Sequence, residues 1–133
     1  RHVVDRQIEA IDQLRAAMAD DPGLKGFVDT LFSDHGISDR TLNNAYQALV
    51  AAVEHYPDLR APLLSVMVRF YDLATEVAGR DMPRATRAEK QAVAHGVVDL
   101  YLAIDALAPL SPPEDWAAAS YDAALRLVRS VSA

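Results

Sequence analysis

The most apolar segment of the chain lies in its middle, between Pro57 and Gly79. Polar residues recur there at helical spacing and form one narrow stripe, while almost every other position from Leu63 to Ala78 is apolar. The stripe consists of Ser65, Arg69, Asp72 and Glu76. A helix that is apolar around most of its circumference must be covered on more than one side. The pattern therefore predicts a central helix over about 60–78, enclosed in a bundle.

Helix boundary signals flank this segment and recur along the chain. Asp58 is a candidate N-cap of the central helix, and Gly79 is its candidate C-terminal signal. Thr86 with Glu89, and Ser111 with Glu114, have the spacing of capping boxes. Apolar residues spaced three and four apart predict five further helices. These cover about residues 3–18, 24–36, 39–55, 87–107 and 114–133, with Ser38 as the N-cap of the third helix in the chain.

Six helical segments without strand-like alternation predict an all-α fold, a helical bundle of five or six helices in a single domain. The core is expected to combine the apolar faces of most of these helices. The predicted core residues are Ile8, Ile11, Leu49, Val53, Leu63, Met67, Phe70, Leu73, Val97, Leu100, Ile104, Leu127 and Val131. From Val97 to Leu107 only Asp99 and Asp105 interrupt the apolar sequence. This half of its helix is therefore predicted to be buried, with each aspartate finding a partner or an exit to water.

Composition narrows the functional classes. The 133 residues are 51% hydrophobic, which suffices for an ordinary core, and the absence of Cys excludes disulfides and thiolate metal sites. A formal charge of −6 argues against a nucleic-acid partner. The bias towards Arg and Asp suggests a bacterial source. No uninterrupted apolar run approaches about 20 residues, and no signal peptide is visible. We expect a cytoplasmic protein, or a secreted effector without a classical signal peptide.

The two ends of the sequence indicate a piece of a longer protein. The chain begins at Arg1 without Met, and the helical pattern is still running at Ala133 with no Gly or Pro to close it. The prediction is a module excised from a larger protein. Its expected partners are then another protein, the other domains of the parent protein, or a second copy of this chain.

Catalytic and metal-binding motifs are not found. No His pair has zinc spacing, no glycine-rich phosphate loop is present, and no cofactor is expected. The one candidate pair is His95 with Asp99, which share a helix face, so that Asp99 could orient the imidazole or both could hold a metal. The simpler interpretation is a surface histidine beside an acid. Histidine phosphotransfer modules also carry a mid-helix His, but they have a Lys shortly after it, whereas Gly96 and Val97 follow His95.

Two surface features favour binding. Arg80, Arg84, Arg87 and Lys90 form a basic cluster in an otherwise acidic chain, which predicts contact with an anion or an acidic partner, or else simple compensation of a helix dipole. Leu24, Lys25 and Phe27 form a candidate apolar tip, or else the start of a packed helix. In architecture alone, a bundle with such a tip resembles the four-helix membrane-localisation domains of some bacterial toxins and effectors. That resemblance implies a membrane surface as partner.

Three functional hypotheses follow. The first is a non-catalytic helical module that binds another protein, because catalytic motifs are missing and the last helix is amphipathic. The second is peripheral targeting to anionic lipid through the basic loop at 80–90. The third is a small phosphorelay protein or enzyme that uses His95.

Overall fold

The computed structural model describes residues 2–19, 23–32 and 40–130. For residues 40–42 it describes the backbone but not the side chains. The fold is all-α. Six α-helices and two short 3-10 helices make up this part of the chain, and it contains no strand. The elements are α1 (His2–Met18), α2 (Gly23–Phe32), α3 (Arg40–Ala51), η1 (Pro57–Leu59), α4 (Arg60–Asp81), α5 (Arg87–Leu107), η2 (Ala108–Leu110) and α6 (Glu114–Ser130). The predicted all-α bundle is confirmed.

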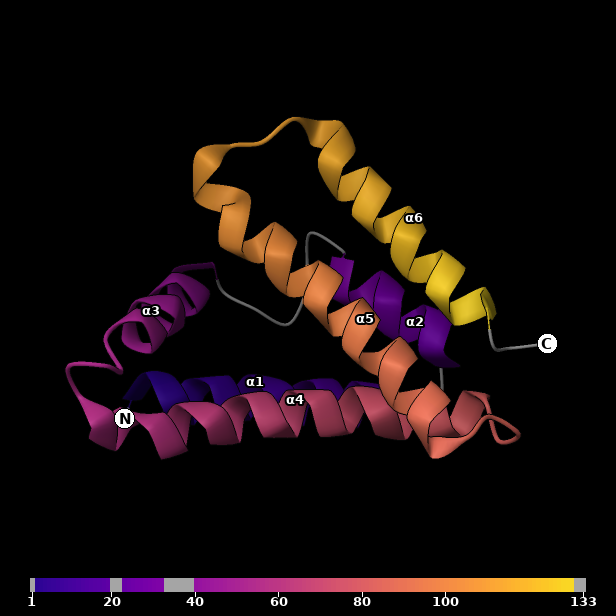
Figure 1. Cartoon of the computed structure of the whole chain (residues 1–133), viewed down its shortest axis with the longest axis horizontal. Coiled ribbons are helices and arrows are strands. Elements are labelled where there is room, and N and C mark those ends of the chain that lie inside the picture. The colour runs from indigo at the N-terminus through magenta and orange to yellow at the C-terminus, as the bar shows by residue number, and fades with distance from the viewer. Residues whose placement is uncertain (1, 20–22, 33–39, 131–133) are drawn as a thin grey trace.

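The central helix predicted around residues 60–78 is α4, and its neighbours surround most of it. It packs against α1, α2, α3 and α5. Helices α1 and α4 lie side by side and run in the same direction, while α5 crosses over them and α6 returns antiparallel to α5 (Figure 1). The four residues of the polar stripe are all exposed. Next to that stripe, however, Leu64 and Val68 are 59% and 48% exposed, so one apolar strip of α4 faces solvent.

The core is centred nearer to α2 than the sequence suggested. Leu24, Phe27 and Val28 are fully enclosed, although the predicted core contained no residue of this helix. Rings from four helices meet beside it, with Phe32 and Phe70 each edge-on to Tyr101 and Phe32 also edge-on to Tyr121. Aromatic pairs of this geometry add to the free energy gained by burial. The predicted core residues Ile11, Leu63, Phe70, Leu73 and Val97 are confirmed as buried. Those only half-buried are Ile8, Leu49, Val53, Met67, Leu100, Ile104 and Leu127.

Burial along α5 follows the prediction only at the start of the segment from Val97 to Leu107. Val97 and Val98 are buried as predicted, together with Val93 and Ala94 one turn earlier. No residue from 99 to 123 is buried, although this range holds the most apolar part of the helix. The helical stretch Arg87–Leu110 contains an 18-residue window with a mean hydropathy of 1.4, long and apolar enough to cross a membrane by length and composition alone. The prediction failed beyond Val98 because α5 crosses α4 near its own N-terminal end and then diverges from it (Figure 1).

Helix ends test the capping predictions one by one. The capping box of Thr86 and Glu89 is present, with backbone-to-side-chain bonds of 2.8 and 3.1 Å. The box at Ser111 is not formed, because Ser111 adopts φ +50° after η2 and α6 starts only at Glu114. Asp58 lies within η1 and does not cap α4, and Gly79 lies inside α4, which continues to Asp81. The predicted boundaries at Gly36 and Ser38 and the core position Val131 fall outside the described residues.

Candidate functional site

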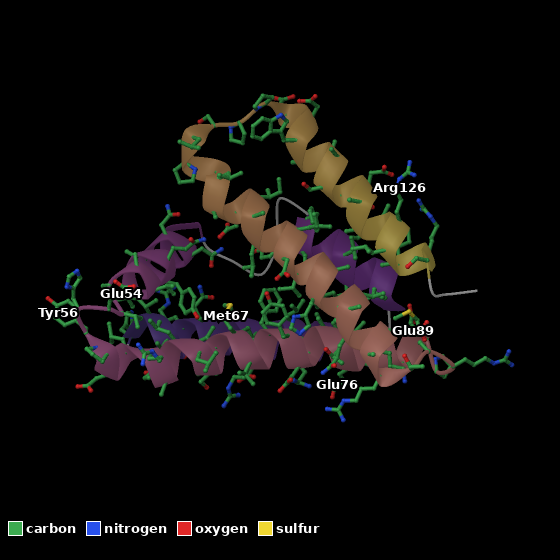
Figure 2. The ribbon with its side chains drawn as sticks, in the orientation of Figure 1. Glu54, Tyr56, Met67, Glu76, Glu89 and Arg126 are labelled. Carbon is green, nitrogen blue, oxygen red and sulfur yellow. The ribbon has the colours of Figure 1, made fainter. Side chains whose placement is uncertain are left out.

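A pocket of about 380 Å³ lies between α1, α3, α4 and the second half of α5. Its floor consists of the buried residues Ile11, Val66 and Phe70. Met67, which is labelled in Figure 2, and Tyr101 add half-buried walls from α4 and α5. The mouth is bordered by exposed residues of two helices, Gln47 and Val50 of α3 and Ala103 and Ala106 of α5. The volume falls in the range of pockets that hold small molecules, and the lining is predominantly apolar.

Two buried polar contacts brace the helices that form this pocket. Gln7 of α1 donates through its Nε2 atom to Oδ1 of Asn43 on α3, at 2.9 Å. Tyr46 donates its hydroxyl to the Leu63 carbonyl at 2.5 Å, which connects α3 to the first turn of α4. Burial raises the pKa of Tyr46 to about 12, so this hydroxyl stays protonated at neutral pH. Because buried polar groups need partners, these contacts fix α3 against the floor and hold the pocket open.

Among the described residues that line the pocket, Asp105 is the only charged one. It is half-buried, and its carboxylate has neither a hydrogen bond nor an ion pair with any other described residue. A carboxylate beside apolar walls favours a ligand that brings a hydrogen-bond donor or a positive charge. The pocket can therefore bind and orient a molecule. Its described lining contains no arrangement of nucleophile and base.

The sequence pattern singles out Asp105 but does not indicate the pocket around it. Asp105 stood out because it interrupts an apolar stretch, which is the one signal that pointed here. Asn43 gave no such signal, because it stands among polar residues in the sequence, yet it is only 8% exposed. Helical periodicity identifies a face of one helix. It does not say that α3 and α5 diverge enough to leave a gap between their apolar faces.

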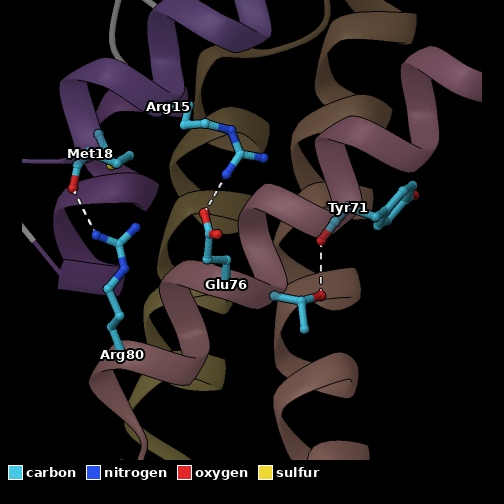
Figure 3. Close-up of polar contacts among 6 residues, drawn as sticks. Arg15, Met18, Tyr71, Glu76 and Arg80 are labelled. Atoms are coloured by element: carbon cyan, nitrogen blue, oxygen red, sulfur yellow. Dashed lines mark hydrogen bonds and ion pairs between the residues drawn. The ribbon is translucent and has the colours of Figure 1, made fainter.

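The basic cluster at 80–90 is spread over several surroundings. Arg80 donates from Nη1 to the Met18 carbonyl at 3.2 Å, so it stabilises the C-terminal end of α1 (Figure 3). Arg84 and Arg87 are exposed, and Lys90 is half-buried with its side chain passing Gly79. Contact of this loop with an anion, an acidic partner or anionic lipid stays a prediction that concerns mainly Arg84 and Arg87.

The same end of α4 also caps α2. Asp81 accepts a hydrogen bond at its Oδ2 atom from the Leu24 backbone N–H, at 2.7 Å. One turn of α4 thus supplies a cation to the end of α1 and an anion to the start of α2, as helix dipoles favour. Nearby, Arg15 of α1 and Glu76 of α4 form an exposed ion pair at 2.5 Å (Figure 3).

The candidate tip formed by Leu24, Lys25 and Phe27 is not an apolar surface. Leu24 and Phe27 are fully buried, because α2 is inserted between α4 and α6, and only Lys25 is exposed. Lys25 pairs with Asp29 at 2.9 Å, and Asp29 also accepts the hydroxyl hydrogen of Tyr121 on α6. The Lys25 ammonium and the Tyr121 hydroxyl both lower the pKa of Asp29. The alternative interpretation, the start of a packed helix, describes this segment.

His95 and Asp99 are brought together through Tyr71 of α4. The imidazole of His95 is stacked on the Tyr71 ring, with centroids 4.1 Å apart, and the Tyr71 hydroxyl donates to Asp99. Burial and the Asp99 carboxylate raise the pKa of Tyr71 to about 12. No group of three or more potential ligands for a metal ion occurs in the described part of the chain. A phosphorelay role for His95 stays a prediction.

Comparison with known proteins adds no relative. No protein-family model, no curated protein and no solved structure matches the chain.

Proposed function

We propose that this chain is a non-catalytic helical domain that binds a small, largely apolar molecule in the pocket between α1, α3, α4 and α5. The observation that carries the proposal is a pocket of about 380 Å³ with mainly apolar and aromatic walls, set between helices. Pockets of this kind, with a few converging polar groups, are the usual binding sites of helical folds.

The lining also defines the chemistry of the ligand. Tyr46, Phe70 and Tyr101 offer ring surfaces, and Met67 offers a flexible thioether that adapts to the shape of a ligand. Asp105 supplies the one charge and Gln47 an amide at the mouth. A flat or branched hydrophobic molecule with one amine or hydroxyl donor satisfies both features, because its donor can reach Asp105 while its body replaces water on the apolar walls.

The test is a fluorescence titration with N-phenyl-1-naphthylamine, a neutral aromatic amine that becomes emissive in apolar surroundings. We expect saturable binding of one probe per chain. Ala106→Trp should fill the mouth of the pocket and weaken binding by about tenfold or more, since it removes the space itself. Ala88→Trp is the matched control, because Ala88 is exposed on the same helix and is not part of the pocket.

Asp105→Asn gives a second, finer test with two probes. It should weaken the binding of a cationic aromatic amine more than that of the neutral probe, because only the former has its charge neutralised by the carboxylate. Equal binding by the wild type, Ala106→Trp and Ala88→Trp would show that the probe sits elsewhere and would contradict the proposal.

We further propose that the chain acts as a protein-interaction module. The observation that favours this role is the run from 99 to 123, which has no buried residue although it includes Leu107, Leu110 and Trp116. These three side chains are 38%, 76% and 51% exposed. Large apolar side chains gathered at one exposed place mark surfaces that another molecule covers.

A further inference from the structure

The outer side of the α5–α6 hairpin, away from the pocket, carries a continuous small and apolar face. We define the outer face by Gly96, Leu100 and Leu107 of α5 and by Trp116, Ala123 and Leu127 of α6. All six residues are half-buried or exposed. Their spacings of four, seven and eleven place each set of three on one side of its helix. The face thus runs along most of the hairpin.

Small residues on this face allow α5 and α6 to pack closely against each other. A Cβ atom at Gly96 would lie 2.7 Å from Cδ1 of Leu127, so α5 and α6 approach closely at that point. A shallow groove runs between them, lined by Gly96, Leu100, Ala123 and Leu127 and bordered by Asp99 and Arg126. Figure 2 shows Arg126 projecting from α6 into solvent.

The charges of the groove are arranged for self-recognition. Asp99 stands on the α5 side and Arg126 on the α6 side, where Arg126 also forms an exposed ion pair with Asp122 of its own helix at 2.8 Å. A two-fold axis that runs along the groove sets the α5 side of one copy against the α6 side of the other, so it places each acid opposite the base of the other copy. A surface that meets itself must carry both signs of charge in this way, because a patch of one sign repels its own copy.

We propose that the outer face binds a second copy of this chain, with α5 and α6 of the two copies forming a four-helix interface. This proposal rests on the proposed interaction role and not on the ligand pocket, which lies on the opposite side of α5. The interface would cover Leu107 and Trp116, and Asp99 of each copy would pair with Arg126 of the other. Aromatic and aliphatic side chains at the centre of such a contact dominate its free energy.

The surroundings of the face disfavour a lipid surface as the occupant. Glu114 and Asp115 open α6 beside Trp116, and Asp99 borders the groove. These acids repel anionic headgroups.

Sedimentation velocity over a range of concentrations tests the proposal. The wild type should sediment as a dimer, at twice its mass of 14.5 kDa. Ala123→Glu places a charge in the groove and should weaken the dimer by at least about tenfold, and Arg126→Glu should weaken it as well. Combining Arg126→Glu with Asp99→Lys restores opposite charges and should recover part of the affinity. Far-ultraviolet circular dichroism checks that each variant keeps its helices.

Two matched controls locate the interface. Arg129→Glu makes the same charge change one turn further along α6, and Val68→Glu puts a charge on the exposed apolar strip of α4. Both variants should remain dimeric. A wild type that is monomeric at every concentration overturns the proposal. A dimer that persists in Ala123→Glu, or one that is lost in Val68→Glu, also overturns it, because the contact would then use another surface.

Discussion

At the scale of single residues, two glycines of this chain differ in whether the backbone needs glycine at their position. Gly23 opens α2 with φ +73°, a backbone conformation that L side chains rarely adopt. A Cβ atom there would also lie 3.0 Å from both carboxylate oxygens of Asp81. Gly79, by contrast, lies within α4, and a Cβ there would meet only Cδ of Lys90, at 4.0 Å.

The same substitution should therefore have opposite effects at the two positions. Gly23→Ala should lower the free energy of unfolding by about 1–3 kcal/mol, because it imposes backbone strain and crowds the cap of α2. Gly79→Ala should raise it by about 0.5–1 kcal/mol, because alanine loses less entropy in a helix. Urea unfolding of both variants measures this difference. A loss of stability in Gly79→Ala would show that the space beside it is not available.

Residue-level predictions from sequence succeeded where the partner is close in the chain. Thr86 and Glu89 are three residues apart, so their capping box could be recognised directly. Asp81 could not be recognised as the cap of α2, because its partner Leu24 is 57 residues away. Asp58 was predicted from local spacing to cap a different helix, α4, and it lies within η1 without capping it.

At the scale of elements, the last turn of α4 organises the helices that precede it. Arg80 bonds to the end of α1 and Asp81 to the start of α2, so one turn fixes the corner between them. The extension of α4 beyond Gly79 is what brings these two side chains into place.

Removing the Asp81 carboxylate should destabilise the fold, because it removes the cap at the start of α2. Asp81→Ala should lower the free energy of unfolding by about 1 kcal/mol, the usual cost of losing a helix cap. Asp81→Asn should cost less, because its amide oxygen can still accept the Leu24 N–H. Asp72→Ala is the control, since Asp72 is exposed on the same helix and has no partner among the described residues, and its effect should stay within about 0.5 kcal/mol. Equal losses for all three variants would contradict the capping role.

At the scale of the whole molecule, the all-α fold and a central helix surrounded by neighbours followed from periodicity. The location of the pocket and the exposure of the second half of α5 did not. An apolar stretch such as 100–107 indicates that other residues pack against it. The prediction was that these residues belong to the same domain. In the structure α2 occupies the centre, and the end of α5 extends past it.

This arrangement predicts uneven local stability. In dilute solution, where the proposed dimer would dissociate, backbone amides from 99 to 123 should exchange with deuterium faster than those from 63 to 78, because no residue from 99 to 123 is buried. Raising the protein concentration should slow exchange in the hairpin selectively. Hydrogen exchange followed by mass spectrometry measures both rates. Equal protection of the two regions at low concentration would contradict the prediction.

The two proposed binding sites, the pocket and the outer face, lie on opposite sides of the same helix, α5. Leu102 and Asp105 of α5 face the pocket, while Leu100 and Leu107 belong to the opposite side of the same turns. A ligand that displaces α5 from the pocket side therefore also displaces the outer face, to which the second copy is proposed to bind. Thermodynamic reciprocity then requires that any preference of the ligand for the paired or the single form be returned as an equal change in the strength of pairing. The apparent affinity of the pocket for its ligand would then depend on the protein concentration.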